Sequence, residues 1–311
     1  MNLDQPPGGG HSITTFRSGF ACFVGRPNAG KSTLTNALVG DKIAITSSRP
    51  QTTRHAIRGL VHRADGQIVL IDTPGLHKPR TVLGERLNEV VRTTWAEVDT
   101  IGVCLPADER VGPGDRFLMA EIAKLRKKPV VAVATKIDLV SKARLAEHLS
   151  TIGRAGEEAG LTWNDVVPVS AVSGEQVSLL AELLLATLPE GPELYPGGQL
   201  TDEPEDILIA EFIREAALEG VRDELPHSIA VTVDEIVRSG SSTKVHASLV
   251  VERDSQKGIV IGHKGARLKE IGTAARQQIE RILGTKVYLD LHVRVAKDWQ
   301  RDPRQLRKLG F

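Results

Sequence analysis

The stretch Gly25–Ser32, which spells GRPNAGKS, decides the fold of this 311-residue chain. It fits the phosphate-binding loop pattern of a glycine, four residues and then Gly-Lys-Ser. The apolar run Gly19–Val24 predicts a buried strand before the loop, and Ser32–Leu38 predicts the start of a helix after it. This context matters, because curled backbone amides and a helix N-terminus together attract a phosphate. A chance glycine loop is the alternative, and the strand–loop–helix order counts against it.

The residue types of this phosphate-binding loop suit a nucleotide. Gly25 and Gly30 let the backbone curl without a Cβ clash. Lys31 would reach the β- and γ-phosphates, and the Ser32 hydroxyl would bind Mg²⁺. We therefore expect a nucleoside triphosphate site with Mg²⁺ as cofactor. The whole loop should contact the nucleotide: Gly25, Arg26, Pro27, Asn28, Ala29, Gly30, Lys31 and Ser32.

Outward from the loop, strand-like and helix-like runs alternate, which favours an α/β fold with a mostly parallel sheet. Ala56–Val61 and Gln67–Ile71 depart from this order, because a short turn joins them and predicts an antiparallel hairpin. We expect a six-stranded sheet with one antiparallel strand. The other strands are predicted at Thr100–Leu105, Val130–Ala134 and Val166–Val169, and helices at Val82–Trp95, Asp115–Leu125, Ala143–Ala159 and Gln176–Leu188.

Proline and glycine then interrupt the pattern at Pro189–Pro192 and Pro196–Gly198, which indicates a linker. Beyond it the predicted order is helix, strand, strand, helix, helix, strand. We expect a flexible tail at 1–17, a nucleotide-binding domain at 18–190, a linker at 191–206 and a smaller α+β domain at 207–311. In the last of these, helices are predicted in Ile207–Glu219 and Ala266–Leu283, and strands at Ser228–Val233, Lys244–Val251 and Val287–Val295.

Charge and cysteine content narrow the class of protein. Residues 257–311 carry 13 Lys and Arg against 5 Asp and Glu, a net +8, whereas the whole chain carries only a net +1. This basic end suggests nucleic acid or an anionic membrane surface as partner. Cys22 and Cys104 lie in apolar runs and predict core residues of a protein in a reducing compartment. We find no run of eighteen apolar residues, so we expect no transmembrane segment.

Two further stretches can respond to a γ-phosphate. In Asp72–Gly75 (DTPG) the aspartate can hold Mg²⁺ through water, and the Gly75 amide can meet the γ-phosphate. In Gln51–Arg54 (QTTR) a hydroxyl can complete the Mg²⁺ shell only while the γ-phosphate is present, which makes the segment an order–disorder switch. An ordinary turn and a polar loop are the alternatives. From the first stretch we expect nucleotide contacts by Asp72, Thr73, Pro74, Gly75 and the following Leu76.

The stretch Thr135–Asp138 (TKID) follows an apolar strand and predicts base recognition. The Asp138 carboxylate can accept hydrogen bonds from guanine N1–H and N2–H₂, a donor pair that adenine lacks, so it would select GTP. The Lys136 stem would pack along the base. A backbone amide in Ser170–Gly174 can close over guanine O6, although a helix N-cap explains that stretch equally well. The expected base contacts are Thr135, Lys136, Ile137, Asp138, Ser170 and Ala171.

In the smaller domain the run Gly262–Gly265 (GHKG) lies between two helical stretches. The order of helices and strands around this run is that of a KH domain, whose Gly-x-x-Gly loop clamps about four nucleotides of single-stranded backbone. A solvated helix–turn–helix with a basic face is the alternative. Aromatic residues for base stacking are scarce: Tyr288, Trp299 and Phe311. Lys297–Phe311 can add phosphate contacts or form a solvated tail helix. The expected RNA contacts are Gly262, His263, Lys264, Gly265, Arg267 and Lys269.

These motifs, taken in order, resemble those of the translation-factor-related GTPases, and QTTRH with DTPGLH narrows the resemblance to the Era family. The resemblance implies a GTPase with a type II KH domain, a P-loop fold, and Mg²⁺ held by Ser32, Thr53 and Asp72. It implies a hydrophobic residue, Leu76, where signalling GTPases carry a water-orienting glutamine, and K⁺ coordinated by Asn28. The implied catalytic residues are Lys31, Thr53, Gly75 and Asn28. The family has asparagine where Thr135 stands, and a hydroxyl can make only one of that asparagine's two contacts.

The resemblance also implies a cellular role. We expect a slow, Mg²⁺-dependent GTPase that binds 16S rRNA and acts in assembly of the 30S subunit. We expect a cytoplasmic monomer, and the basic C-terminal region permits peripheral association with the membrane. An RNA-binding protein with a degraded nucleotide pocket is the alternative, supported by Thr135 alone. A metabolic P-loop kinase or ATPase would leave Asp138 and the KH-like domain unexplained.

Overall fold

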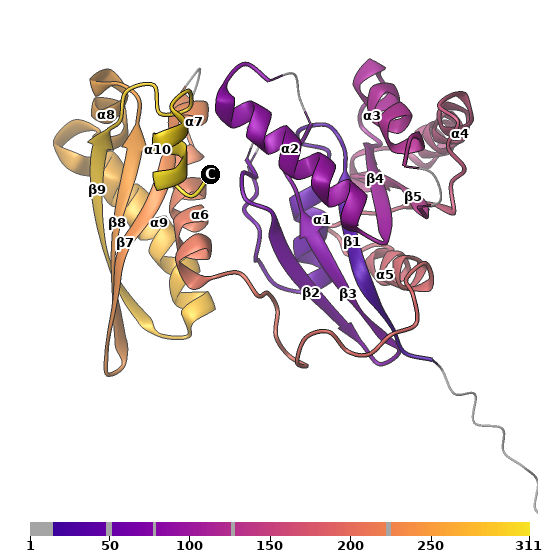
Figure 1. Ribbon diagram of the computed structural model, residues 1–311, viewed down its shortest axis with the longest axis horizontal. Coiled ribbons are helices and arrows are strands. Elements are labelled where there is room, and N and C mark those ends of the chain that lie inside the picture. The colour runs from indigo at the N-terminus through magenta and orange to yellow at the C-terminus, as the bar shows by residue number, and fades with distance from the viewer. Residues whose placement is uncertain (1–14, 48–51, 77–78, 126–127, 222–224) are drawn as a thin grey trace, which may run out of the picture.

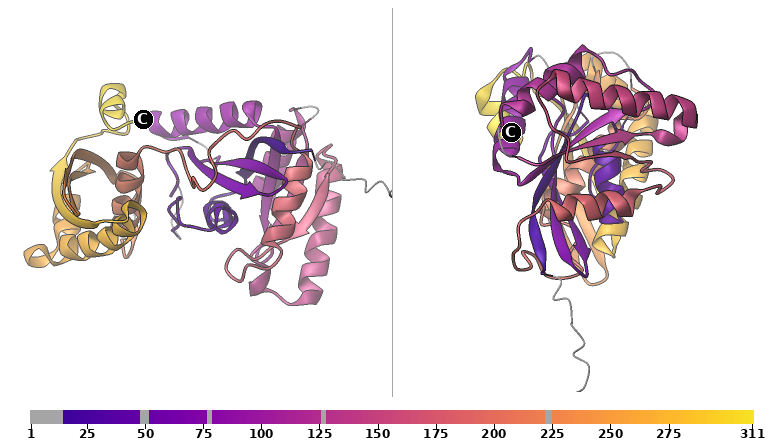
Figure 2. Two further views of the ribbon diagram at one scale, coloured as in Figure 1. Left: turned by 90° about the horizontal axis from the view of Figure 1, so that it is seen from below. Right: turned by 90° about the vertical axis from the view of Figure 1, so that its right-hand side faces the viewer.

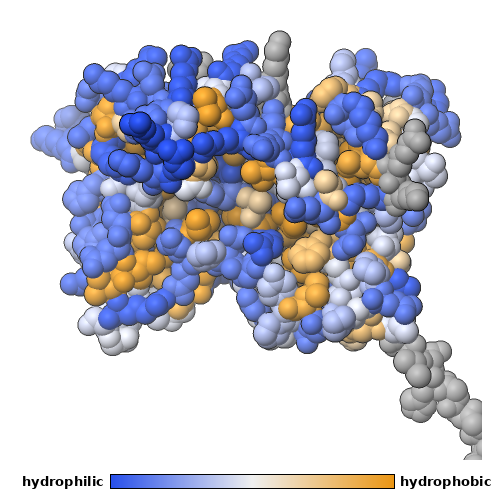
Figure 3. Space-filling view, in the orientation of Figure 1, coloured by the Kyte–Doolittle hydropathy of each residue, from blue (hydrophilic) through white to orange (hydrophobic). Residues whose placement is uncertain are grey.

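A computed structural model describes residues 15–47, 52–76, 79–125, 128–221 and 225–311. The chain forms two lobes (Figure 1), which we call the first and the second domain. A long connection joins them, as seen from below in Figure 2. The surface is largely hydrophilic, with apolar patches on both lobes (Figure 3).

The first domain is built on a six-stranded sheet in the order β2-β3-β1-β4-β5-β6. Every neighbouring pair is parallel except β2 with β3, which confirms the predicted hairpin. Because β1 pairs in parallel with β3 and β4, the carboxyl ends of these three strands lie at one edge. The strands are β1 (Arg17–Val24), β2 (Ile57–Arg63), β3 (Gly66–Asp72), β4 (Thr100–Pro106), β5 (Val130–Thr135) and β6 (Asp165–Pro168).

Helices cover both faces of this sheet, and the alternation along β1 shows why. Ala21 and Phe23 pack with helices α1 and α5 on one face, whereas Cys22 and Val24 pack with α2, α3 and α4 on the other. Successive side chains of a strand point to opposite faces, so a strand covered on both faces is apolar throughout. The helices are α1 (Lys31–Val39), α2 (Val82–Glu97), α3 (Pro113–Ala123), α4 (Lys142–Glu158) and α5 (Val177–Ala186).

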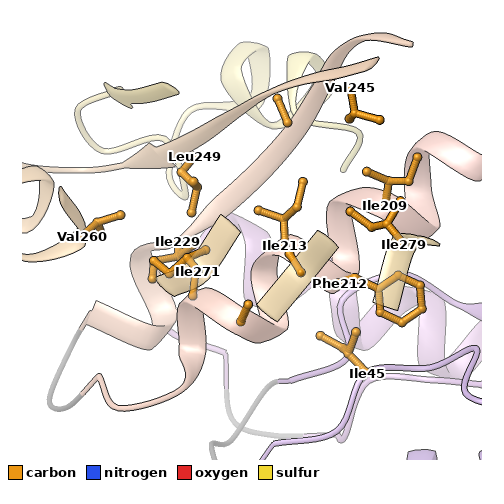
Figure 4. Packing of buried hydrophobic residues seen from close by; sticks show 14 of the residues in the cluster. Ile45, Ile209, Phe212, Ile213, Ile229, Val245, Leu249, Val260, Ile271 and Ile279 are labelled. Carbon is orange, nitrogen blue, oxygen red and sulfur yellow. The ribbon is translucent and has the colours of Figure 1, made fainter. Parts of the chain in front are cut away.

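The second domain has a three-stranded sheet, β7-β8-β9, in which β7 and β8 are antiparallel and β8 and β9 are parallel. Its apolar core lies between one face of the sheet and the helices α6 and α9, and includes Val245, Ala247, Leu249 and Val251 of β8 as predicted (Figure 4). The elements are α6 (Glu205–Leu218), α7 (Leu225–Ser228), β7 (Ala230–Ser239), β8 (Ser242–Val251), α8 (Asp254–Ile261), α9 (Ala266–Leu283), β9 (Lys286–Val295) and α10 (Pro303–Lys308).

Several details differ from the sequence-based expectations. Ser228, predicted to begin a strand, lies in α7, and β7 begins at Ala230. Arg17, placed in the tail, begins β1 because it pairs with Gly66. Glu205 and Asp206, placed in the linker, form the first turn of α6, where acidic side chains favour the helix dipole. The linker itself is anchored, since Leu60 donates a backbone hydrogen bond to Leu200 at 2.9 Å. Among the described residues, no helix has the length and apolar character needed to cross a membrane.

Candidate functional site

The phosphate-binding loop joins the end of β1 to the start of α1, as the sequence predicted. A Cβ on Gly25 would lie 2.8 Å from the carbonyl oxygen of Cys104, so only glycine fits there. Gly30 has φ 90° and Asn28 has φ 62°, both in the left-handed region. Lys31 is buried, and its Nζ donates to the carbonyl oxygens of Gly25 at 3.1 Å and Arg26 at 3.0 Å. The loop is therefore curled around an ammonium whose pKa burial lowers.

Three side-chain oxygens meet beside the loop. Ser32 Oγ lies 3.0 Å from Thr53 Oγ1, and Thr53 Oγ1 donates to Asp72 Oδ2 at 3.2 Å. Asp72 is fully buried, and burial raises the pKa of its carboxyl to about 6. Within the described part of the chain, its second oxygen, Oδ1, has no hydrogen-bond partner.

This oxygen cluster fits Mg²⁺. Hydroxyl and carboxylate oxygens are the ligands that this hard cation prefers. A cation would also offset the cost of burying the Asp72 charge, which is the cause of the raised pKa. Ser32, Thr53 and Asp72 are the residues that would hold the metal, and Thr53 comes from a segment that the sequence alone marked as a switch.

Asp72–Gly75 continues from β3 past the loop. A Cβ on Gly75 would lie 3.5 Å from Lys31 Nζ and 3.4 Å from the Pro27 nitrogen, so this backbone passes close to the lysine. Thr73 is buried, and Leu76 packs against the core under α2, α3 and α4. The structure thus places an apolar side chain after Gly75. His77 of the same stretch and Gln51 of the switch lie outside the described residues.

A cavity of about 580 Å³ opens over the loop. It brings together residues that are far apart in the sequence, including Thr52 and Thr53 from the switch segment. Its lining consists of Pro27, Asn28, Gly30, Lys31, Ser32, Thr33, Ile45, Thr46, Ser47, Thr52, Thr53, Gly75, Glu109 and Lys136. This size suits part of a nucleotide.

The predicted base-recognition residues gather at the end of β5. Asp138 is exposed, and Ser170 Oγ donates to its Oδ1 at 2.6 Å. Thr135 Oγ1 donates to the Ala29 carbonyl oxygen at 2.7 Å, so the hydroxyl braces the phosphate-binding loop. Lys136 takes φ 58° and lies 3.7 Å from Asp108. Ile137 is buried, and Ala171 follows Ser170 at the same edge.

Arg26 was predicted to contact the nucleotide, and its guanidinium is engaged elsewhere. It donates to buried Asp115 at 2.7 Å and lies 2.9 Å from Glu109. Both partners lie at or near the start of α3, which is anchored to the loop in this way. Sequence reasoning missed Asp115 and Glu109, because no local pattern connects them to the loop.

The Gly262–Gly265 loop lies between α8 and α9 of the second domain, as predicted. Gly262, Lys264 and Gly265 all have positive φ, at 72°, 49° and 81°. His263 and Lys264 are exposed. A Cβ on Gly265 would meet no atom within 4 Å, so this backbone is open to close approach by a ligand.

A groove of about 550 Å³ leads away from this loop between α9 and β9. The lining residues on α9 are three or four positions apart, so they share one face of the helix with Lys269. This spacing is a signal in the sequence from which they could have been predicted. The strand side of the groove ends in Tyr288, whose side chain is well exposed. The lining residues are Gly265, Leu268, Lys269, Gly272, Thr273, Arg276, Val287, Tyr288, Leu289 and Leu291.

Arg267 and Trp299, which the sequence offered for contact with RNA, have other partners in the structure. Arg267 turns back, and its guanidinium donates to the Glu219 carbonyl oxygen after α6 and pairs with Glu270. Trp299, one of three candidates for base stacking, is not available for that role, because it is fully buried and donates to the Ser228 carbonyl oxygen at 3.0 Å. The stretch Lys297–Phe311 is not a solvated tail, since Leu306 and Leu309 pack with Leu83 and Leu87 of α2.

Comparisons with known proteins agree with this geometry. A family model described as a 50S ribosome-binding GTPase matches residues 20–136, and a KH domain model matches residues 224–300. The chain is 66% identical to GTPase Era of Streptomyces coelicolor, covering 96% of each chain. It is 62% identical to GTPase Era of Mycolicibacterium smegmatis, covering 96% of this chain and all of the relative.

Two solved structures extend the comparison. A variant of Aquifex aeolicus Era bound to GDP·AlF₄⁻ matches with a TM-score of 0.89 at 37% identity, covering 94% of this chain and 99% of that one. A second structure holds Era with MgGDPNP and nucleotides 1506–1542 of 16S ribosomal RNA. It matches with a TM-score of 0.90 at 37% identity, covering 95% and 99%.

Proposed function

The chain belongs to the Era family of GTPases, and on that premise we propose that it is a GTP-controlled RNA-binding protein that acts in assembly of the 30S subunit. The single observation that carries the proposal is the similarity of this chain, over 95% of its length, to an Era structure that holds both MgGDPNP and nucleotides 1506–1542 of 16S ribosomal RNA. We assign both of those ligands to sites made by this chain's own residues.

In the first domain we assign the nucleotide as GTP. Lys31 and the amides of Gly25–Ser32 bind the phosphates, and Mg²⁺ supplies charge neutralisation to the transferring phosphoryl group. Ser32, Thr53 and Asp72 hold that cation. Asp138 accepts two hydrogen bonds from guanine, and Ser170 fixes the carboxylate in place. Thr135 supports the site by bracing the loop, which argues against a degraded pocket.

Hydrolysis proceeds in this proposal without a glutamine, because Leu76 cannot orient water. The Gly75 backbone senses the γ-phosphate, and Lys31 stabilises its developing charge. Asn28 lines the cavity beside the phosphates and offers an amide oxygen to a monovalent cation. We therefore propose slow intrinsic turnover that K⁺ and bound RNA both raise.

Replacing Asn28 by glycine tests the potassium assignment. Glycine tolerates the positive φ of this position, and the substitution removes the whole side chain together with its amide oxygen. We expect wild-type GTP hydrolysis to be several-fold faster in KCl than in NaCl at equal ionic strength, and the Asn28→Gly variant to show no difference. Equal rates of the wild type in both salts would contradict the potassium assignment and leave the GTPase assignment standing.

In the second domain we assign single-stranded RNA to the groove. The Gly262–Gly265 loop approaches the phosphates, while Lys264, Lys269 and Arg276 supply positive charge. Tyr288 offers one stacking surface at the groove's edge. The partner is the 3′ end of 16S rRNA in the maturing small subunit. His263 extends the same exposed loop, and Arg267 holds it to α6.

Crosslinking in cells tests the cellular role. We expect RNA crosslinked to the protein to be enriched in the 3′ end of 16S rRNA, and replacement of Lys264 and Lys269 by glutamate to remove that enrichment. Enrichment of unrelated RNA would contradict the ribosomal assignment. The place in the cell and the assembly state are proposals from charge and family: a cytoplasmic monomer whose basic C-terminal region, residues 257–311, permits peripheral membrane contact.

A further inference from the structure

The second domain contacts the chain on the N-terminal side of Thr53, at Lys42, Ile45 and Thr46. Ile45 is buried in the core of the second domain, where it lies beside Phe212 of α6 (Figure 4). Glu215 of the same helix accepts a hydrogen bond from the Thr46 amide at 2.7 Å and pairs with Lys42 at 2.5 Å. Because the Glu215 carboxylate is almost fully buried, this contact belongs to the interior of the interface and is not an exposed surface ion pair.

The second domain also contacts the two residues on either side of Thr53, which are Thr52 and Arg54. The Arg214 guanidinium donates to the Thr52 carbonyl oxygen. Arg54 donates to the carbonyl oxygens of Ile229 at 2.6 Å and His227 at 2.7 Å, just before β7. Thr53 therefore points its hydroxyl at the metal ligands while both neighbours are tied to the second domain.

Arg54 is buried where it contacts the second domain. The residue is 3% exposed, and its guanidinium lies 5.6 Å from the centre of the Trp299 ring. Burial and the nearby Arg214 lower the Arg54 pKa to about 9. A guanidinium in such surroundings is stable only while its hydrogen bonds are made. Displacement of the segment that carries Thr53 would therefore leave a buried guanidinium without these acceptors, which is costly.

The C-terminal segment of the chain lies next to the Arg54 contact and also reaches the start of α2. Phe311 stacks on His55 with ring centres 4.9 Å apart, and on Trp299 at 5.9 Å. The Leu83 amide donates to the Gln300 carbonyl oxygen at 3.1 Å at the start of α2. The C-terminal segment of the second domain thus contacts both His55, next to Arg54, and the start of α2.

We propose that Arg54 and Arg214 are positioning residues of the GTP site, through which the second domain sets the Mg²⁺-ligating position of Thr53. Closing of Thr53 on Mg²⁺–GTP and docking of the second domain are then one event. The inference rests on the proposed function and adds its route of regulation. Because coupling between two sites is reciprocal, whatever favours the docked arrangement raises affinity for the triphosphate by the same factor.

The test compares Arg54→Met with Arg238→Met. Arg238 makes an exposed ion pair with Glu205 in the same domain, so its replacement is a matched control. We expect Arg54→Met to weaken Mg²⁺–GDPNP binding by about tenfold, in the range typical of coupled sites, and to leave GDP affinity within about twofold. A fluorescent GDPNP and a fluorescent GDP report the two affinities. Trp299→Leu, which removes the ring and keeps Arg54, should act in the same direction.

Hydrogen exchange supplies a readout independent of hydrolysis. In the wild type, exchanging GDP for Mg²⁺–GDPNP should slow exchange of the amides of 52–55 and 229–231 together. In Arg54→Met the slowing at 229–231 should be absent. The inference is overturned if both variants match Arg238→Met in GDPNP affinity and exchange while the wild type binds GTP. If the wild type itself binds no guanine nucleotide, the proposed function fails instead.

Discussion

Replacing Asp138 by asparagine is expected to weaken GTP binding by about 10²- to 10⁴-fold and to create preference for xanthosine triphosphate. In the proposed GTP site the carboxylate accepts two hydrogen bonds from guanine, and each bond to a charged group contributes about 1.5–3 kcal/mol. Asparagine keeps one acceptor and adds a donor, which opposes guanine N2–H₂ and suits the xanthine O2. Ser170 Oγ can still donate to the amide oxygen, so the loop should keep its shape.

Competition between GTP and xanthosine triphosphate for the variant measures this change. Asp206→Asn, at an exposed position in the first turn of α6, is the matched control and should keep the wild-type preference. If Asp138→Asn still preferred GTP, the base-recognition site would have to lie elsewhere than at the end of β5.

Replacing Gly265 by aspartate is expected to reduce RNA affinity by about a hundredfold while GTP affinity stays unchanged. Nothing lies within 4 Å of a Cβ at this position, so the new carboxylate would project into the space that a phosphate must occupy. Gly262 is a poorer choice, because its Cβ would lie 2.6 Å from the Cβ of Arg267 and would disturb the fold of the loop.

The control for this variant lies at the other end of the same helix. Gly284 follows α9, has φ 64° and is equally open, so Gly284→Asp carries the same backbone strain and the same charge change. Filter binding of a 16S rRNA 3′-end oligonucleotide compares the two. Similar affinities of the two variants would remove the Gly262–Gly265 loop from the RNA site.

Local sequence patterns predicted most of the fold because the information was local. The period of two along Lys244–Val251 placed its alternate residues in the core, and they are buried there. The glycines of the phosphate-binding loop marked a strand–helix junction, which the structure confirms. In such cases a single element fixes its own conformation and its buried face.

Contacts between distant segments could not be predicted in this way. Trp299 is a candidate for base stacking by sequence, because the sequence does not distinguish an exposed aromatic from a buried one whose partner, here Arg54, lies far away along the chain. The phosphate-binding loop pattern predicts a nucleotide contact for Arg26, and positive charge beside the Gly-x-x-Gly loop predicts an RNA contact for Arg267, yet Asp115 and the Glu219 carbonyl oxygen engage them. Charge shows that a partner is needed and does not show which one.

Control of RNA affinity by the γ-phosphate of the bound nucleotide can be tested directly by one measurement. The affinity of the full chain for a 16S rRNA 3′-end fragment is measured with Mg²⁺–GDPNP and with Mg²⁺–GDP, at one fixed salt concentration because such affinities fall steeply with salt. We predict binding about tenfold tighter with GDPNP, from a typical coupling between two sites. Equal affinity in the two nucleotides would contradict this control by the γ-phosphate.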